Sequence, residues 1–290
     1  MLKIMLGFDC DRPRGNFINT SDGSKMAVRK IESLQRITET LNSLVIPRTF
    51  FICGQFLESM SNKFGISCVR ESFGSDNYLV ELADHTYSHN VLAGIKTRPD
   101  KIPISIGQVT QEYHINTILF REIFGLEIGE RGYRTPLGHY CGLSNEKLLL
   151  DTLLDLKIKY ISSDLRDNNE SIYPPVCING QPRQPYHYQN GLLEIPSMGW
   201  HDTAFSGTSK TPFFTSPPSN YLEIIDYYHE LLRDAYYFAQ DSNTYFLGLV
   251  LHPYDLSIYD EKKRIFYDIL DIAQSLNAVF CRYDSVLENL

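Results

Sequence analysis

Short apolar runs alternate with amphipathic segments from one end of the chain to the other. Runs with the length and composition of strands are found at residues 2–8, 48–53, 79–83, 130–134, 158–163, 192–196, 245–251 and 278–281. Apolar residues recur near helical spacing in segments 25–44, 108–124, 144–156, 221–239 and 262–276. The run 245–251 is apolar throughout, which is typical of a strand buried on both faces. The alternation predicts an α/β fold with mostly parallel strands, formed by residues 1–290 as a single domain.

Two polar stretches, 61–76 and 205–220, interrupt this alternation. The first contains two glycines, and the second is rich in serine, threonine and proline. We predict that both are long loops, which in a compact domain are usually functional or mobile. They could form the wall or lid of a cleft, or they could be surface insertions.

Composition narrows the class of protein. Hydrophobic residues make up 43% of the chain and charged residues 21%, which excludes a disordered, collagen-like or coiled-coil protein. The net charge of −8 argues against a nucleic-acid-binding protein, although it leaves room for a local basic patch. No apolar run approaches the ~20 residues of a membrane span, and the N-terminus lacks the features of a signal peptide. We therefore expect a cytoplasmic protein whose six scattered cysteines are free thiols.

Reactive polar side chains follow several of the predicted strands directly. These side chains are Asp9, Asp11, His85, His89, Arg134, Asp164, Asp167 and His252. In a parallel α/β barrel the active site lies at the C-terminal ends of the strands. The side chains could therefore converge on one rim of the fold.

The most informative of these residues are two histidines and two aspartates. His85 and His89 are four residues apart, so one helical turn would direct both imidazoles to the same side. Two imidazoles and a carboxylate make a three-ligand site with open positions, which suits Zn²⁺ or non-haem Fe²⁺. Asp9 and Asp11 follow a predicted buried strand, and buried carboxylates need partners. Either aspartate can therefore supply the carboxylate ligand. The alternative for both is a helix cap or a turn beside Pro13.

These segments resemble the motifs of polysaccharide deacetylases with a NodB-homology domain, carbohydrate esterase family 4. The matching segments are Phe8-Asp9-Cys10-Asp11, His85-Thr86-Tyr87-Ser88-His89, Arg134-Thr135-Pro136-Leu137-Gly138 and Leu249-Val250-Leu251-His252-Pro253. A looser fifth motif contains Asp164 and Asp167, with Asn168 in place of the usual tryptophan, and Cys10 separates two aspartates that are adjacent in the family. The motifs span nearly the whole chain, and the resemblance implies a distorted (β/α) barrel of the NodB type. Segments 8–15, 159–166 and 279–281 are also similar to the cytosolic 4-deoxy-4-formamido-L-arabinose-phosphoundecaprenol deformylase branch.

The resemblance implies a metal site and a general base. Asp11, His85 and His89 would bind one divalent metal ion, with Zn²⁺ as the first choice and Fe²⁺, Co²⁺, Ni²⁺ or Mn²⁺ as alternatives. Asp9 would be the general base. Arg134 would pair with Asp9 and keep it ionised, because a neighbouring cation lowers the pKa of a carboxyl group.

The resemblance also implies groups for the other steps of amide hydrolysis. The backbone N–H of Leu137 would help to hold the oxyanion. His252 would be the general acid, and Asp167 or Asp164 would keep it protonated. In the segment Gly199-Trp200-His201-Asp202, Trp200 could be a stacking platform for a sugar and His201 could line the cleft. The alternative for Trp200 is a packed aromatic.

Together these residues predict a metal-dependent hydrolase that removes an acetyl or formyl group from an amino sugar. The expected substrate is a small nucleotide- or lipid-linked glycan precursor at the cytosolic side, with at most peripheral membrane contact and no nucleic acid. Two alternatives remain at this point. One is an amidohydrolase acting on a linear or cyclic amide outside carbohydrates, and the other is a sugar-binding module without a metal. The oligomeric state is open.

Overall fold

The strands and helices alternate along the chain as the hydrophobic pattern indicates. The computed structural model describes residues 1–126, 131–211, 213, 215–241 and 244–288. Its strands are β1 (Leu2–Cys10), β2 (Arg48–Ile52), β3 (Val80–Asp84), β4 (Gly132–His139), β5 (Tyr160–Asp164), β6 (Cys177–Ile178), β7 (Gln181–Pro182), β8 (Tyr186–His187), β9 (Leu193–Glu194), β10 (Tyr245–Leu251) and β11 (Val279–Cys281). Its helices are α1 (Ser21–Ser43), α2 (Gly54–Phe64), α3 (Ile66–Phe73), α4 (Ile106–Phe124), α5 (Lys147–Asp155), α6 (Tyr221–Asp241), α7 (Pro253–Tyr259) and α8 (Arg264–Ser275).

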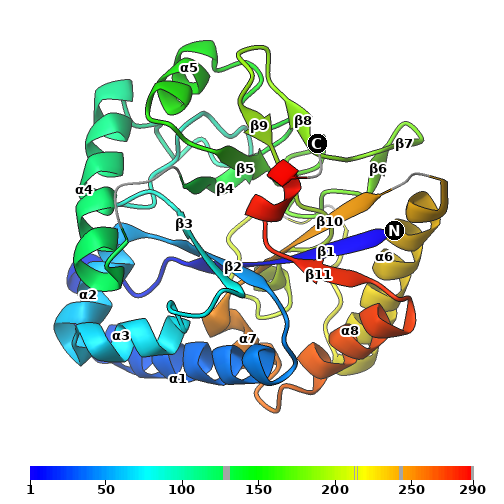
Figure 1. Ribbon diagram of the computed structural model, residues 1–290, viewed down its shortest axis with the longest axis horizontal. Helices are drawn as coiled ribbons and strands as arrows, with labels where there is room; N and C mark the ends of the chain where they lie inside the picture. Colours follow the sequence, from blue (N-terminus) through cyan, green and yellow to red (C-terminus); the bar gives the residue numbers. More distant parts are fainter. Residues whose placement is uncertain (127–130, 212, 214, 242–243, 289–290) are drawn as a thin grey trace.

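One curled, mostly parallel sheet forms the centre of the molecule. Its strand order is β10-β1-β2-β3-β4-β5-β9-β8, and β11 also pairs with β1. Only the β8–β9 pair is antiparallel among the described pairs of this sheet. The helices lie around the outside of the sheet, and the central strands β1, β2 and β10 run side by side (Figure 1). The result is a half-barrel whose strand ends gather at one rim.

The alternation of side chains along β1 decides which of them face the interior of the half-barrel. Ile4, Leu6 and Phe8 belong to the large core between the sheet and the outer helices. Met5 belongs instead to a second core inside the half-barrel, together with Phe51. Because successive side chains of a strand point to opposite faces, Asp9 lies on the same face as Met5. The strand therefore delivers a carboxylate to the inner rim.

The structure corrects the prediction that residues 61–76 form a loop. Helix α2 continues to Phe64, and α3 occupies Ile66–Phe73. Gly65 and Gly74 have φ values of 86° and 61° and stand at helix ends, so they separate two short helices rather than mark a loop. Val69 and Phe73 bury the inner face of α3 in the main core. The second stretch, 205–220, contains no helix or strand among its described residues, as predicted.

Two further boundaries differ from those read from the sequence. The predicted strand 130–134 begins at Gly132 and continues to His139, while residue 130 lies outside the described residues. The predicted cap Ser144 does not start a helix, because α5 begins at Lys147 with Glu146 at the cap position. The Ser144 hydroxyl donates instead to the carbonyl of Cys141 at 2.6 Å. None of the described helices is long and apolar enough to cross a membrane.

Candidate active site

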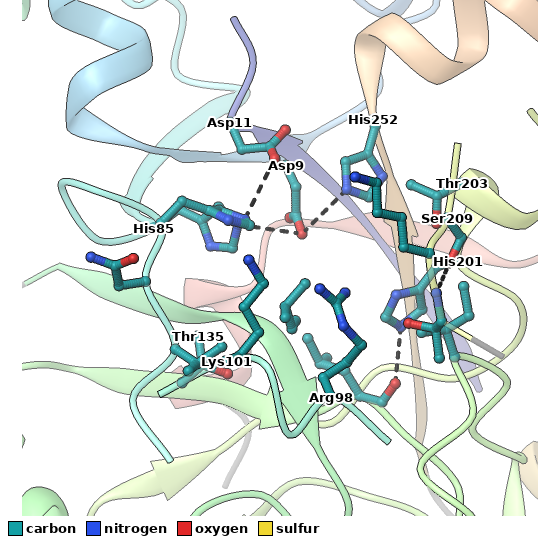
Figure 2. A pocket seen from close by; sticks show the side chains of 18 of the residues that line it. Asp9, Asp11, His85, Arg98, Lys101, Thr135, His201, Thr203, Ser209 and His252 are labelled. Carbon is teal, nitrogen blue, oxygen red and sulfur yellow. Dashed lines mark hydrogen bonds and ion pairs between the residues drawn. The ribbon is translucent and has the colours of Figure 1, made fainter. Parts of the chain in front are cut away.

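A pocket of about 510 Å³ opens where the C-terminal ends of the strands meet. Its lining includes Asp9, Asp11, His85, His89, Leu137 and His252. Figure 2 shows Asp9 between His85 on one side and His252 on the other. Side chains separated by more than 240 positions in the sequence thus share one pocket, because β10 and β1 are neighbours in the sheet.

Asp9 is held by a buried arginine. Arg134 Nη1 lies 2.7 Å from Asp9 Oδ1, and the arginine side chain is fully buried. Its guanidinium carbon lies 3.8 Å from the centre of the Phe51 ring and 4.9 Å from that of Tyr283. Burial alone would raise the pKa of Asp9, but Arg134, and after it the histidines nearby, lower it below its ordinary value. Asp9 is therefore ionised and fixed in direction.

The small size of Gly7 makes this arrangement possible. A Cβ atom at residue 7 would lie 2.8 Å from both Nη1 and Nη2 of Arg134. We expect Gly7→Ala to displace the guanidinium and to destabilise the protein by about 1–3 kcal/mol, as overpacking a core does. Urea denaturation measures this loss. Gly94→Ala is the control, because a Cβ there meets nothing within 4 Å; an equal loss in both variants would contradict the explanation.

His85 and His89 converge without the helical turn that their spacing predicts. Thr86 and His89 have φ values of 60°, so the segment after β3 is an irregular loop. The loop is held because Thr86 Oγ1 accepts the His89 N–H at 2.9 Å, and Asp84 Oδ1 accepts the Thr86 N–H at 2.8 Å. The two imidazole rings meet edge to face with their centres 4.8 Å apart. The prediction of a shared direction holds, but its cause is a turn and not a helix.

The ring nitrogens indicate how the histidines can act as ligands. His85 Nδ1 lies 2.9 Å from the carbonyl oxygen of Arg134 and donates to it, which leaves the Nε2 lone pair free. That Nε2 lies 3.8 Å from Asp9 Oδ2. His89 Nε2 lies 3.5 Å from Asp11 Oδ2. Arg14 Nη2 lies 3.5 Å from His89 Nδ1, a separation too long to fix the tautomer of that ring.

Asp11, His85 and His89 have the charge states that a divalent cation requires. Burial lowers the pKa of both imidazoles below their ordinary values, so they are neutral ligands near pH 7. Burial alone would raise the pKa of Asp11, but Arg12, His89 and Arg14 together hold it well below its usual range. A carboxylate with two neutral imidazoles is a donor set that suits Zn²⁺ and related ions. The donor types and charge states of these residues suit the metal that the sequence predicts, but among the described residues only a neighbouring group has all its ligand atoms within 4.8 Å of one another.

A second group of three potential ligands lies beside them. The ligand atoms of Asp202, His252 and Asp255 lie within 4.8 Å of one another, so this group could also hold a metal ion. Each member already has hydrogen-bond partners. His252 Nδ1 lies 2.6 Å from Asp202 Oδ1, and Asp255 Oδ1 accepts hydrogen bonds from Ser206 and Thr208. Asp202 thus positions His252, while Asp255 holds Ser206 and Thr208 of the 205–220 stretch.

Asp202, and neither of the aspartates predicted from the sequence, is the partner of His252. Asp202 Oδ2 also accepts the His252 backbone N–H at 2.7 Å. Burial alone would lower the pKa of His252, but Asp202 and then Asp9 raise it to about 9. Burial raises the pKa of Asp202 to about 6, although His252 opposes this. Between these values Asp202 is ionised and His252 is protonated.

Asp164 and Asp167 have other partners, which corrects the prediction made for them. Asp164 Oδ1 forms an ion pair with Arg183 Nη2 at 2.7 Å and accepts the Cys141 N–H. Asp167 Oδ1 accepts two backbone N–H groups, from residues 169 and 171, and so closes a turn. Asp202 was missed because it ends no predicted strand. The only sequence feature that pointed to Asp202 was its position next to His201, in a segment predicted from the sequence to lie near the cleft.

The remaining predicted residues divide between the pocket and the core. Trp200 is only 4% exposed and stacks on Tyr173, with ring centres 4.6 Å apart, so it is a packed aromatic and does not line the pocket. His201 does line the pocket, and its Nε2 donates to the carbonyl of Leu165 at 2.9 Å. Leu137 also lines it and has a φ of 64°, at an irregularity between β4 and β5. The role of the Leu137 N–H stays a prediction.

Comparisons with known proteins identify the fold. No protein-family model and no curated protein matches the chain. A solved structure described as a "putative polysaccharide deacetylase from Mycobacterium smegmatis" is 17% identical with a TM-score of 0.60, over 99% of this chain and 89% of that one. The Puue allantoinase is 15% identical with a TM-score of 0.61, over 98% and 88%. A GH57 branching enzyme from Thermococcus kodakaraensis is 10% identical with a TM-score of 0.62, over 99% and 70%.

These likenesses confirm the predicted fold. The chain has an α/β architecture with a curled, mostly parallel sheet, similar to the distorted barrel of NodB-type deacetylases. The same fold occurs in a branching enzyme, so the fold alone does not select the reaction.

Proposed function

We propose that this protein is a metal-dependent hydrolase that removes an N-acyl group from an amino sugar. The observation that carries the proposal is the convergence of a buried carboxylate–arginine pair, two imidazoles with a carboxylate, and a protonated histidine on one pocket. These groups are Asp9 with Arg134, His85 and His89 with Asp11, and His252. They match the requirements of amide hydrolysis, which needs a base, an electrophilic centre and an acid.

The chain's own residues can move the protons of this reaction. A divalent ion held by Asp11, His85 and His89 would polarise the amide carbonyl and acidify a water molecule. Asp9 Oδ2 faces the space between His85 Nε2 and His252 Nε2, at 3.8 Å and 4.0 Å, and can accept the proton of the attacking water. The Arg134 guanidinium keeps that carboxylate ionised until the proton arrives.

His252 is suited to protonate the leaving amine. Its Nδ1–H donates to Asp202, so its Nε2–H is the proton that points toward Asp9 and the pocket. The raised pKa keeps this proton in place at neutral pH. The acid and the base thus lie on the same side of the pocket, with Nε2 4.0 Å from Asp9 Oδ2. The backbone N–H of Leu137 would assist by donating to the oxyanion.

The choice of an amino sugar rests on the sequence motifs and on the size of the pocket. A volume of about 510 Å³ lies within the range of sites for small molecules, ~300–1,000 Å³. A second candidate is an amide outside carbohydrates, and two observations favour it. Trp200 is buried, so it offers no stacking surface for a sugar, and an allantoinase shares the fold. A panel of N-acyl sugars and cyclic amides separates the two candidates.

The first test is release of acetate or formate from N-acyl amino sugars. Chelation of divalent metals and His85→Ala should each abolish release, and His85→Ala should weaken metal binding by more than about tenfold, since losing even a residue that only supports a ligand costs that much. Metal content and acid release are measured on the same samples. His229→Ala, an exposed change on α6, is the control and should retain both. Activity that survives both chelation and His85→Ala would end the proposal.

A further inference from the structure

The pocket is basic although the chain is acidic. The chain has a net charge of −8, yet Arg98, Lys101, Arg166 and Lys210 line the pocket beyond the proposed metal ligands. The acidic residue that accompanies them there is Asp100. The remaining lining carboxylates are the proposed base and the proposed metal ligand, which pair with arginines of their own. The four cationic residues, which we call the basic wall, therefore carry more positive charge than Asp100 neutralises.

The two lysines of the wall are unpaired. Among the described residues, the side chain of neither Lys101 nor Lys210 has a hydrogen bond or an ion pair, and both side chains are exposed to solvent. Figure 2 shows Lys101 and Arg98 reaching from their loop into the pocket. Lys210 approaches from a different segment, the 205–220 stretch. Two free ammonium groups thus face one cavity from separate parts of the chain.

The two arginines of the wall add a buried positive charge. Asp100 binds Arg98 with two contacts, of 2.9 Å and 2.8 Å, and so occupies its planar fork. Arg166 has no carboxylate within 4.0 Å among the described residues, and its Nη2 is buried without a partner. Its Nε donates to the carbonyl of Leu137 at 2.8 Å, which fixes the side chain against the pocket floor. Burial and the like charge of Arg98 lower its pKa to about 10, which still leaves it charged near neutral pH.

We propose that this basic wall binds a phosphate group carried by the substrate. The proposal rests on the proposed function and specifies its substrate as an N-acyl amino sugar with a phosphate ester. Phosphate fits better than carboxylate, because the free cations are lysines, which bind the several oxygens of a phosphate as point charges. A lone carboxylate would favour a bidentate arginine, and the fork of Arg98 is already taken by Asp100. An uncharged polymer would offer no anionic group to pair with the lysines of the basic wall.

Binding of sugars that contain no amide tests the phosphate site separately from hydrolysis. Glucose, glucose 1-phosphate, UDP-glucose, a short-chain prenyl phosphoglucose and glucuronic acid are titrated into the protein by calorimetry. We expect glucose 1-phosphate to bind at least about tenfold more tightly than glucose or glucuronic acid, since a charged hydrogen bond is worth that much. The preference should weaken as salt is added. Whichever of the UDP and prenyl compounds binds more tightly identifies the source of the phosphate.

The matched variants are two pairs of lysine substitutions. Lys101→Gln/Lys210→Gln should bring the affinity for glucose 1-phosphate down to that for glucose, with thermal unfolding unchanged. Lys159→Gln/Lys262→Gln removes the same charge from exposed positions outside the pocket and should leave binding intact. Equal binding of glucose or glucuronic acid, or an unaffected Lys101→Gln/Lys210→Gln protein, overturns the inference. Lysine-dependent phosphate binding without hydrolysis of any N-acyl sugar would support it and refute the proposed function alone.

Discussion

Replacing Arg134 by methionine is expected to lower the free energy of unfolding by about 3–5 kcal/mol, the cost of removing one partner from a buried ion pair. Arg134 is fully buried, and its Nη1 is 2.7 Å from Asp9 Oδ1. Its other polar atoms contact Ser162 and Ser197. Methionine would fill much of the space between Phe51 and Tyr283 but would leave the Asp9 carboxylate without its cation. Urea denaturation measures the loss.

Two further variants separate this effect from a general loss of packing. Adding Asp9→Asn to Arg134→Met should restore part of the stability, because it removes the unpaired charge, and the double-mutant cycle gives the coupling. Arg282→Met is the less buried counterpart, since the half-buried Arg282 pairs with Asp284 at 2.8 Å. It should cost no more than about 1 kcal/mol. Equal losses for Arg134→Met and Arg282→Met, or no coupling with Asp9, would contradict a buried ion pair as the cause.

The sequence predicts the parts of the site that follow from strand pattern alone. The period of two along β1 places Asp9 on the face of Met5, and β10 ends at Leu251, directly before His252, because its apolar run ends there. Parallel pairing then brings the two strand ends together. Arg134 lies inside β4, which continues to His139, so the end of a strand does not account for its place. Local pattern and sheet topology therefore suffice for the base and the acid but not for the arginine.

Contacts made by irregular segments could not be predicted. Asp202 reaches His252 from a loop 50 positions away, and no hydrophobic period marks its place. Trp200 lies two positions before Asp202 but packs into the core against Tyr173, and that placement depends on a partner distant in the sequence. The loop of His85 and His89 depends on positive φ values at residues other than glycine, which side-chain spacing does not reveal. Such conformations arise from tertiary contacts, here those of the Tyr87 and Ser88 backbone N–H groups with Glu112.

The shared location of Lys101 and Lys210 likewise could not be predicted from the sequence. The net charge of −8 correctly allows a local basic patch, but only the fold places these two lysines on one cavity. One lies before α4 and the other lies in the stretch before α6. Composition therefore bounds the average surface of the protein and does not describe the pocket.

Replacing Asp202 by asparagine is expected to move the alkaline limit of activity from near pH 9 to below pH 6.5. Asp202 is the largest influence that raises the pKa of His252, to about 9, against the opposing effect of burial. Without that charge, burial should lower the pKa below its ordinary value, so His252 would be neutral at pH 8 and unable to donate a proton. Loss of a general acid costs about 10²–10⁴-fold in rate. A pH profile of kcat/KM measures both the shift and the loss.

The pH dependence of the free energy of unfolding gives a second test of the pKa of His252. Because the pKa of His252 is raised on folding, the stability that it contributes is complete below about pH 6.5 and is lost as the pH rises through about 9. Asp202→Asn should remove this decline between pH 6.5 and 9. Asp167→Asn is the matched control, since its Oδ1 accepts only backbone N–H groups and the amide retains that oxygen. If Asp167→Asn moved the alkaline limit and Asp202→Asn did not, His252 would be tuned by the aspartate predicted from the sequence, and the pair seen here would be structural only.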